Sequence, residues 1–457
     1  MAPKFGTSGL RGLVVELTPD LVADHVRAFQ RSCPVGSGLF VGQDLRPSSP
    51  GIAATVMGVA EAEGVAVTDC GVLPTPALAL AAMQAGAGAV MITGSHIPAD
   101  RNGLKFYTPE GEITKAHEGA ILASLGTEPS DIAGPGRRTL DASGAYAARY
   151  VQGFGPGALA GLRIGVYQHS SVARDVMAEV VAALGAEPVA LARSDIFIPV
   201  DTEAVDPETR AMLAAWCAEH GLDAVISTDG DADRPMLSDA SGRLVPGDVL
   251  GALTAQALGA EVICTPVSSN TQVDGLFGRV IRTRIGSPYV IAAMEAVLAE
   301  TPSARVVGYE PNGGFLLGFE ARGMAPLLTR DCLLPMLAPL AEAQTRGLPL
   351  ADLVAGLPPR FTAADRLQGI APETAASFIA GMAGSAEARA AFFETMPAET
   401  ALDLTDGLRV TFAGGEILHL RASGNAPEFR CYAEADSTDL AVALVAEYLE
   451  RLHARLG

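Results

Sequence analysis

The chain is 457 residues long, is 49% hydrophobic, and carries a formal net charge of −20 from 32 Lys and Arg against 52 Asp and Glu. A chain of this length is too long to fold around one hydrophobic core, so we expect three or four domains. The acidic surface argues against nucleic acid and membranes as partners. The six cysteines form no Cys-x-x-Cys pair, which indicates reduced thiols in a cytoplasmic protein rather than a disulfide framework or a zinc knuckle.

Short apolar runs alternate with Ala-rich stretches through the first three quarters of the chain, which predicts α/β units on mostly parallel sheets. In the N-terminal part we expect a helix at 51–64, a helix that ends at 83–86, and strands at 38–42, 65–68 and 89–93. The last of these strands delivers Gly94, Ser95 and His96 at its carboxyl end. That end of an open α/β sheet is where ligands bind.

The uncharged run at 71–94 is long enough to be considered as a membrane span. It contains Pro74, Pro76, Gly86 and Gly88, which would break a spanning helix. A buried turn, helix and strand is therefore the predicted structure of this run. The N-terminus also lacks the apolar segment of a secretion signal.

The α/β alternation continues beyond a Gly- and Pro-rich stretch at 153–161. The expected elements are a helix at 172–184 and strands at 162–167, 224–227, 261–265 and 305–308. From about residue 358 the pattern changes to a separate α+β domain, with strands at 408–412 and 417–422 and a closing helix at 437–456. The predicted domains are 1–145, 146–245, 246–357 and 358–457, and the first three could share one topology.

Three carboxylates crowd the turn after the strand at 224–227, namely Asp229, Asp231 and Asp233. Such groups repel one another unless a cation lies between them. A calcium-binding EF-hand loop would need glycine and glutamate where this chain has Arg234 and Ala240. A solvated acidic turn remains the alternative, but three carboxylates with room for further ligands suit Mg²⁺ that shares a phosphate oxygen.

The run Thr93-Gly-Ser-His-Ile-Pro98 offers a hydroxyl at the mouth of a sheet. A lone serine is a poor nucleophile, and a turn serine is the simpler interpretation of Ser95 taken by itself. His96 could likewise be an ordinary polar residue. Lys105 is close enough in sequence for its ammonium group to return to the same place.

Three further segments carry groups that suit phosphate or sugar. Residues 5–12 combine glycines, hydroxyls and Arg11 in a loop that can approach a phosphate, although no P-loop pattern occurs and nucleotide binding is unsupported. Residues 421–430 place two arginines around a Ser-Gly-Asn turn, and residues 310–314 could accept hydrogen bonds from sugar hydroxyls. Each segment could also be only a surface turn.

Taken in order, these segments resemble the α-D-phosphohexomutase family over essentially the whole chain, and the stretches 41–49, 73–76 and 283–286 add to the similarity. The resemblance implies an α/β fold. Three similar α/β/α domains with mixed, mostly parallel sheets and a C-terminal α+β domain would surround a central cleft. The sequence leaves the oligomeric state open.

The family resemblance also implies roles for individual residues. Ser95 would carry the phosphoryl group and, with Asp229, Asp231 and Asp233, would hold Mg²⁺. The shell around that group would be Arg11, His96, Lys105 and Arg234, with Lys105 as the candidate general acid/base. Sugar and second-phosphate binding would fall to Arg284, Glu310, Asn312, Arg421, Ser423, Gly424, Asn425 and Arg430.

The activity implied by the resemblance is a phosphomannomutase that interconverts mannose 6-phosphate and mannose 1-phosphate through phosphoserine. A hexose 1,6-bisphosphate would be the intermediate and the activator, and phosphoglucomutase activity could accompany it. Gly94 and Ile97 stand where the family more often has Ala and Asn, and Asn312 stands where it has Ser. These departures leave two alternatives open, a phosphoglucosamine mutase and a sugar-phosphate-binding protein without turnover.

Overall fold

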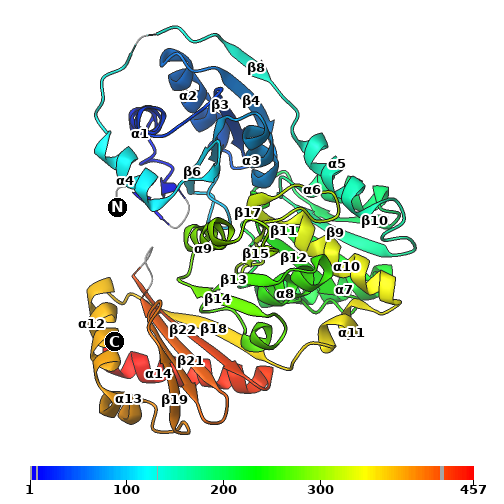
Figure 1. The fold of residues 1–457 in the computed structure, drawn as a ribbon, viewed down its shortest axis with the longest axis vertical. Coiled ribbons are helices and arrows are strands. Elements are labelled where there is room, and N and C mark those ends of the chain that lie inside the picture. The colour runs from blue at the N-terminus through cyan, green and yellow to red at the C-terminus, as the bar shows by residue number, and fades with distance from the viewer. Residues whose placement is uncertain (1–2, 7–8, 131, 423–426, 457) are drawn as a thin grey trace. The chain divides into compact units, whose positions relative to one another are not determined.

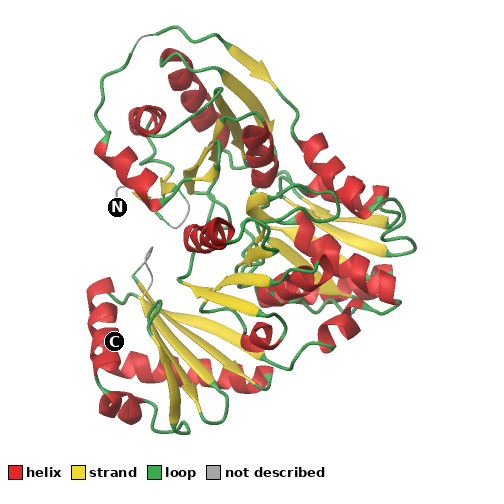
Figure 2. Ribbon diagram, viewed as in Figure 1, coloured by secondary structure: helices red, strands yellow, loops and turns green. Residues whose placement is uncertain are grey.

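The computed structural model describes residues 3–6, 9–130, 132–422 and 427–456 of the chain. The strands form four sheets against which the helices pack (Figures 1 and 2). The chain divides into two compact units: unit 1 is Met1–Ile263 with Gly286–Val354, and unit 2 is Cys264–Ile285 with Ala355–Gly457. Within the described part of the chain, no helix combines the length and the apolar character needed to cross a membrane.

The first sheet of unit 1 has the strand order β1-β2-β6-β5-β3-β4-β8, with β7 paired to β6. Its strands are β1 (Lys4–Phe5), β2 (Leu10–Leu13), β3 (Leu39–Gln43), β4 (Val67–Val72), β5 (Gly88–Ile92), β6 (Arg101–Thr108), β7 (Gly111–Glu112) and β8 (Arg137–Thr139). Strands β3, β4, β5 and β8 run parallel, whereas β6 is antiparallel to both β5 and β2. The sheet is therefore mixed.

Helices cover this sheet. They are α1 (Pro19–Ser32), α2 (Ser49–Ala62), α3 (Thr75–Gln84) and α4 (Lys115–Ala123), and α5 (Ser143–Phe154), further along the chain, contacts α3. Helix α1 begins where the hydroxyl of Thr18 accepts a hydrogen bond from the first turn and Pro19 occupies the first helical position. Its apolar face buries Val26 and Phe29 in a cluster with residues of α2 and the sheet. In Figure 1, α3 lies across the strands from α1 and α2.

The uncharged run at 71–94 folds as predicted, into the end of β4, helix α3 and the fully buried strand β5. The strand predicted at 65–68 was placed too early, because it is β4, Val67–Val72. Helix α2 closes in a turn in which Gly64 has a φ of +81° and the Val65 N–H donates to the Ala60 carbonyl at 3.0 Å. The chain cannot become extended before that turn is complete.

The second sheet of unit 1 has the order β10-β9-β11-β12. Its elements are β9 (Arg163–His169), α6 (Arg174–Ala183), β10 (Glu187–Arg193), α7 (Pro207–His220), β11 (Ala224–Thr228) and β12 (Pro235–Asp239). Strands β9, β10 and β11 are parallel, and β12 returns antiparallel to β11 with Thr228 opposite Pro235. Residues 229–234 are therefore the connection between two paired strands, which holds both ends of the aspartate loop.

The third sheet has the order β14-β13-β15-β16-β17, and the boundary between the two units falls within β13. Its elements are α8 (Gly247–Leu258), β13 (Val262–Pro266), the 3-10 helix η1 (Thr271–Gly275), β14 (Arg279–Thr283), α9 (Ser287–Glu300), β15 (Val306–Tyr309), β16 (Phe315–Leu317), β17 (Leu327–Asp331), α10 (Leu333–Arg346) and α11 (Leu350–Ala355). Strands β15, β16 and β17 are antiparallel, so residues 310–314 form the tight turn from β15 to β16.

The fourth sheet lies in unit 2 and is antiparallel throughout, in the order β18-β22-β21-β20-β19. Its elements are β18 (Phe361–Gln368), α12 (Pro372–Gly384), α13 (Ala386–Phe392), β19 (Glu399–Asp403), β20 (Leu408–Phe412), β21 (Ile417–Ala422), β22 (Glu428–Ala435) and α14 (Thr438–Leu456). The strands predicted at 408–412 and 417–422 and the closing helix are confirmed. The α/β fold with a C-terminal α+β part is confirmed with them.

Candidate active site

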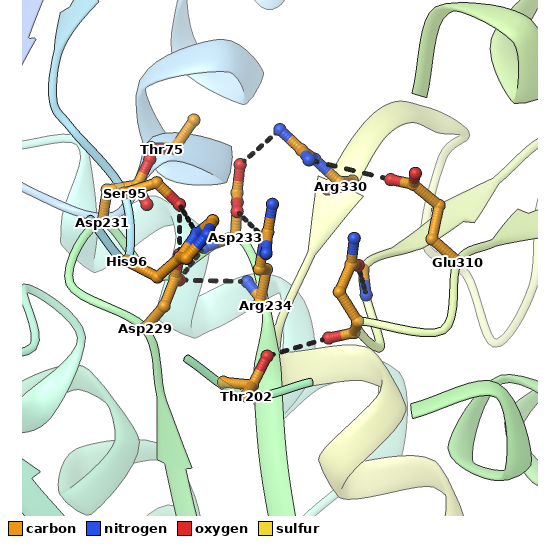
Figure 3. Close-up of polar contacts among 12 residues, drawn as sticks. Thr75, Ser95, His96, Thr202, Asp229, Asp231, Asp233, Arg234, Glu310 and Arg330 are labelled. Carbon is orange, nitrogen blue, oxygen red and sulfur yellow. Dashed lines mark hydrogen bonds and ion pairs between the residues drawn. The ribbon is translucent and has the colours of Figure 1, made fainter. Parts of the chain in front are cut away.

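Ser95 lies on the loop from β5 to β6 and is almost completely buried, with 1% of its surface exposed. Its Oγ donates a hydrogen bond of 2.6 Å to Oδ2 of Asp229, although the two residues are 134 positions apart in the sequence. The Nδ1 atom of His96 lies 3.3 Å from the same Oγ (Figure 3). Ser95 adopts a φ of +56°, a conformation that costs energy for a residue other than glycine and that indicates a tightly constrained loop.

The constraint on this loop comes from Arg46, whose side chain is buried beside the loop. The guanidinium pairs with Asp44 at 3.1 Å and lies 4.0 Å from the ring centre of Phe197. Its two terminal nitrogens donate to four carbonyl groups, those of Ser95, Ile97 and Pro98 in the loop and that of Arg101 at the start of β6. A Cβ atom on Gly94 would lie only 2.6 Å from the carbon of this guanidinium. In this structure the arginine therefore occupies the space that a side chain at position 94 would need.

We expect Gly94→Ala to lower kcat/KM by about 10- to 100-fold, because the added methyl group displaces Arg46 and with it the serine loop. Steady-state kinetics and a thermal melt would measure the effect. The matched control is Gly51→Ala in helix α2, where a Cβ atom meets nothing within 4 Å and should leave activity unchanged. Wild-type kcat/KM in Gly94→Ala would show that the loop tolerates movement of the arginine.

The three aspartates lie together at the end of β11, and all three are buried. One ligand oxygen from each of Asp229, Asp231 and Asp233 lies within 4.8 Å of the others. The main-chain N–H groups of Asp233 and Arg234 donate to Oδ1 of Asp229, at 3.3 Å each. Burial rules out the alternative of a solvated acidic turn, and the group remains the arrangement expected for a divalent cation site.

The protonation of this cluster shows how strongly the carboxylates interact. Burial, and then the negative charges of Asp231 and Asp233, raise the pKa of Asp229 well above its usual range. Burial alone would also raise the pKa of Asp231, but the ion pair with Lys105 outweighs it and lowers that pKa. Among the described residues, Asp231 Oδ1 and Asp233 Oδ1 are buried oxygens without a hydrogen-bond partner. Buried hard oxygen atoms of this kind fit a divalent cation.

Positive side chains surround the aspartates. Lys105, on β6, places its Nζ atom 2.6 Å from Asp231 Oδ2 and 2.5 Å from Asp233 Oδ2. Burial, followed by the charge of Arg234, lowers the pKa of Arg11 to about 10, so Arg11 stays charged at neutral pH. Burial and the same neighbour lower the pKa of His96 to about 2, so its imidazole is neutral there. The carboxylates are therefore flanked by the cationic side chains of Lys105 and Arg11, which can bind an anionic substrate.

The turn from β15 to β16 carries Glu310 and Asn312, which are both buried. Oε2 of Glu310 accepts a hydrogen bond of 2.9 Å from Ser287, at the start of α9. The side-chain oxygen of Asn312 accepts from the main-chain N–H of Gly314 at 3.0 Å, and its carbonyl accepts from Thr202 at 3.1 Å. The asparagine therefore fixes the shape of the turn with its oxygen.

Unit 2 contains the remaining predicted binding residues. Arg421 pairs with Asp406 at 3.1 Å, and the same carboxylate accepts the main-chain N–H of Ile285, next to Arg284. Arg430 is directly opposite Arg421 in the β21–β22 pairing. The predicted residues Ser423, Gly424 and Asn425 lie outside the described residues.

Three residues of the site have no role predicted from the sequence: Arg46, Thr75 and Arg330. Thr75 donates to Asp231 Oδ2 at 2.9 Å, and Arg330 pairs with Asp233 Oδ2 at 2.7 Å. Arg46 lies in the stretch 41–49 and Thr75 in the stretch 73–76, which both contribute to the family resemblance. That resemblance is the feature of the sequence that could have indicated a role for these two residues. Nothing in the sequence around Arg330 indicates that this arginine is buried.

A buried serine hydroxyl that is hydrogen-bonded to a cluster of three carboxylates and flanked by cationic side chains is the arrangement expected of an enzyme of phosphoryl transfer. Four family descriptions match the chain: phosphoglucomutase/phosphomannomutase alpha/beta/alpha domain I at residues 2–131, domain II at 148–242, domain III at 246–361 and the C-terminal domain at 375–451. The chain belongs to this family, the α-D-phosphohexomutases, and is an isomerase that works by intramolecular phosphotransfer.

Individual relatives agree with this assignment. A phosphomannomutase of Sinorhizobium fredii is 44% identical over 474 residues, with 100% of both chains covered. A phosphoglucosamine mutase of Dinoroseobacter shibae is 29% identical, with 98% of each chain covered. The crystal structure of a phosphoglucomutase/phosphomannomutase family protein from Burkholderia thailandensis has the same fold, with a TM-score of 0.77 at 23% identity and coverage of 97% and 96%.

Proposed function

We propose that the chain interconverts mannose 6-phosphate and mannose 1-phosphate, with phospho-Ser95 as the phosphoryl donor and a hexose 1,6-bisphosphate as the intermediate. The observation that carries the proposal is the 2.6 Å contact between the Ser95 hydroxyl and Asp229 inside a buried carboxylate cluster. A serine placed there can carry a phosphoryl group next to the position of a cation. Phosphoryl transfer depends mainly on such positioning and charge neutralisation.

In the proposed first step, a free hydroxyl oxygen of the sugar attacks the phosphorus of phospho-Ser95. The bond between phosphorus and the serine oxygen breaks, and the sugar becomes a bisphosphate. Lys105 is the proposed general acid/base: its ammonium supplies a proton to the serine oxygen as the phosphoryl group leaves, and the amine so formed takes up the proton that the attacking hydroxyl gives up. In the reverse sense, the Ser95 hydroxyl accepts the other phosphoryl group of the turned intermediate, which completes the isomerisation.

Mg²⁺ is the proposed cation, held by Asp229, Asp231, Asp233 and an oxygen of phospho-Ser95, where it would neutralise charge on the phosphoryl group. Arg11, Arg234 and neutral His96 would line the same phosphoryl group. For the phosphate that is not transferred we propose Arg284, Arg421 and Arg430 together with Ser423, Gly424 and Asn425. Glu310 and the amide nitrogen of Asn312 would bind sugar hydroxyls, and a hexose 1,6-bisphosphate would act as activator.

Mannose is the proposed sugar because the relative at 44% identity is a phosphomannomutase and the phosphoglucosamine mutase is at 29%. We expect kcat/KM for mannose 1-phosphate to exceed that for glucosamine 1-phosphate by about 10- to 100-fold, since the sugars differ in the group on carbon 2. Each sugar 1-phosphate would be assayed with Mg²⁺ and a trace of its 1,6-bisphosphate. Fastest turnover of glucosamine 1-phosphate would overturn the choice of sugar. Absence of turnover with every sugar would favour a binding protein.

A further inference from the structure

Arg330 is a buried arginine on β17 whose side chain is only 4% exposed. One terminal nitrogen lies 2.7 Å from Oδ2 of Asp233, in the aspartate loop. The other lies 3.7 Å from Oε2 of Glu310, in the turn assigned to the sugar. Figure 3 shows the guanidinium between these two carboxylates. A single side chain therefore contacts both the loop proposed to hold the cation and the turn proposed to bind the sugar.

The β15–β16 turn has no space for side chains at Gly313 and Gly314, because Arg330 and Pro235 lie against these two residues. A Cβ atom on Gly314 would lie 2.7 Å from Cδ and 2.8 Å from Cγ of Arg330. A Cβ atom on Gly313, which has a φ of +87°, would lie 2.7 Å from the ring of Pro235, just after the aspartate loop. The two glycines let the turn pack directly on the aspartate loop and let the stem of the arginine cross it.

The strand that carries Arg330 is fixed on both sides of that residue. The hydroxyl of Thr329 donates to Glu112 on β7 at 2.9 Å. Asp331 accepts hydrogen bonds from Tyr146, at 2.6 Å, and from Tyr150, both on α5. Contacts with two other elements therefore hold the backbone at Arg330, and the guanidinium starts from a rigid base.

Neutralisation of Asp233 does not by itself require Arg330, because Lys105 pairs with the same oxygen at 2.5 Å. What Arg330 adds is the link to Glu310. A guanidinium can contact two carboxylates through two nitrogens in a fixed plane, whereas an ammonium is a point charge. We propose that Arg330 is a positioning residue that fixes the Glu310 carboxylate relative to Asp233, so that the sugar hydroxyl is presented in line with the phosphoryl group. This inference rests on the proposed function of the same site.

A double-mutant cycle tests the link. Arg330→Met keeps most of the stem and removes the fork, and we expect it to lower kcat/KM by about 10- to 100-fold, as misplacement of substrate does. If Arg330 acts through Glu310, the double variant with Glu310→Gln loses no more than about twofold beyond the worse single variant. Losses that multiply would overturn the proposal. Arg346→Met on the surface of α10 is the matched control and should match the wild type.

Two further measurements separate positioning from a general loss of structure. Loss of the phosphoryl group from phospho-Ser95 to water does not use Glu310, so in Arg330→Met its rate should stay within about twofold of wild type while transfer to sugar falls. Equal changes in both rates would overturn the proposal. Arg330→Lys serves if the methionine variant does not fold, and it should recover only part of kcat/KM because one ammonium cannot hold both carboxylates. Full recovery would also overturn the role of the fork.

Turnover by the wild-type protein checks the proposed function separately. If the wild type turns over a hexose phosphate and the losses multiply, the role of Arg330 fails alone. If the wild type turns over none, both the function and this inference fail.

Discussion

Ser95→Ala is expected to abolish phosphoryl incorporation and to lower kcat by about 10⁴-fold or more, because no other group of the site takes over from a lost nucleophile. The hydroxyl donates to Asp229 at 2.6 Å and is buried. Alanine would delete only that oxygen, since the loop is held through main-chain carbonyls by Arg46. We therefore expect the loss of activity to occur without loss of the fold.

Intact-mass measurement and peptide mapping, after incubation with mannose or glucose 1,6-bisphosphate, would locate the phosphoryl group in the wild type and show its absence in the variant. The matched control is Ser194→Ala, since the hydroxyl of Ser194 contacts only its own loop in the described structure, at Ile196. Unmodified Ser95 in the wild type, or normal turnover in Ser95→Ala, would contradict the phosphoserine scheme.

The sequence predicts those parts of the site in which a catalytic loop directly follows an apolar strand. The apolar run at 89–93 and the strand at 224–227 both appear, as β5 and β11, and the loops that follow them carry Ser95 and Asp229. That the two loops meet does not follow from hydrophobic patterning, because the contact spans 134 positions. Family resemblance indicated the meeting, and the 2.6 Å contact agrees with it.

Buried cations were less predictable. An arginine is ordinarily exposed, and its burial depends on acceptors that come from distant segments. Arg46 finds its acceptors on a loop about 50 positions away, and Arg330 pairs with Asp233 almost 100 positions earlier. A Cβ atom at Gly94 would collide with Arg46, and one at Gly314 would collide with Arg330. These contacts cannot be predicted from the sequence, because they depend on where the arginine side chains lie.

Asp231→Ala is the second large effect that we expect, a loss of metal-dependent turnover of about 10³-fold with the fold retained. Asp231 Oδ2 holds Lys105 at 2.6 Å and Thr75 at 2.9 Å, whereas its Oδ1 has no hydrogen-bond partner among the described residues. Without Asp231, Lys105 remains paired with Asp233 at 2.5 Å. Removal of this carboxylate relieves the repulsion that raises the pKa of Asp229, but it also removes the acceptor of Thr75 and one of the two partners of Lys105, so the metal-free variant should fold with a melting temperature no higher than that of the wild type.

Thermal melts with and without Mg²⁺ separate loss of the cation from loss of the fold. A cation that binds only the folded chain stabilises it by about 2.7 kcal/mol at a hundredfold excess over its Kd, so the wild-type melting temperature should rise with Mg²⁺ and that of Asp231→Ala should not. Asp206→Ala is the control, because Asp206 caps helix α7 outside the site, and its loss should cost about 1 kcal/mol without a change in the Mg²⁺ response. A full Mg²⁺ response with unchanged turnover in Asp231→Ala would exclude Asp231 as a ligand, because the site would then bind and use Mg²⁺ without this carboxylate.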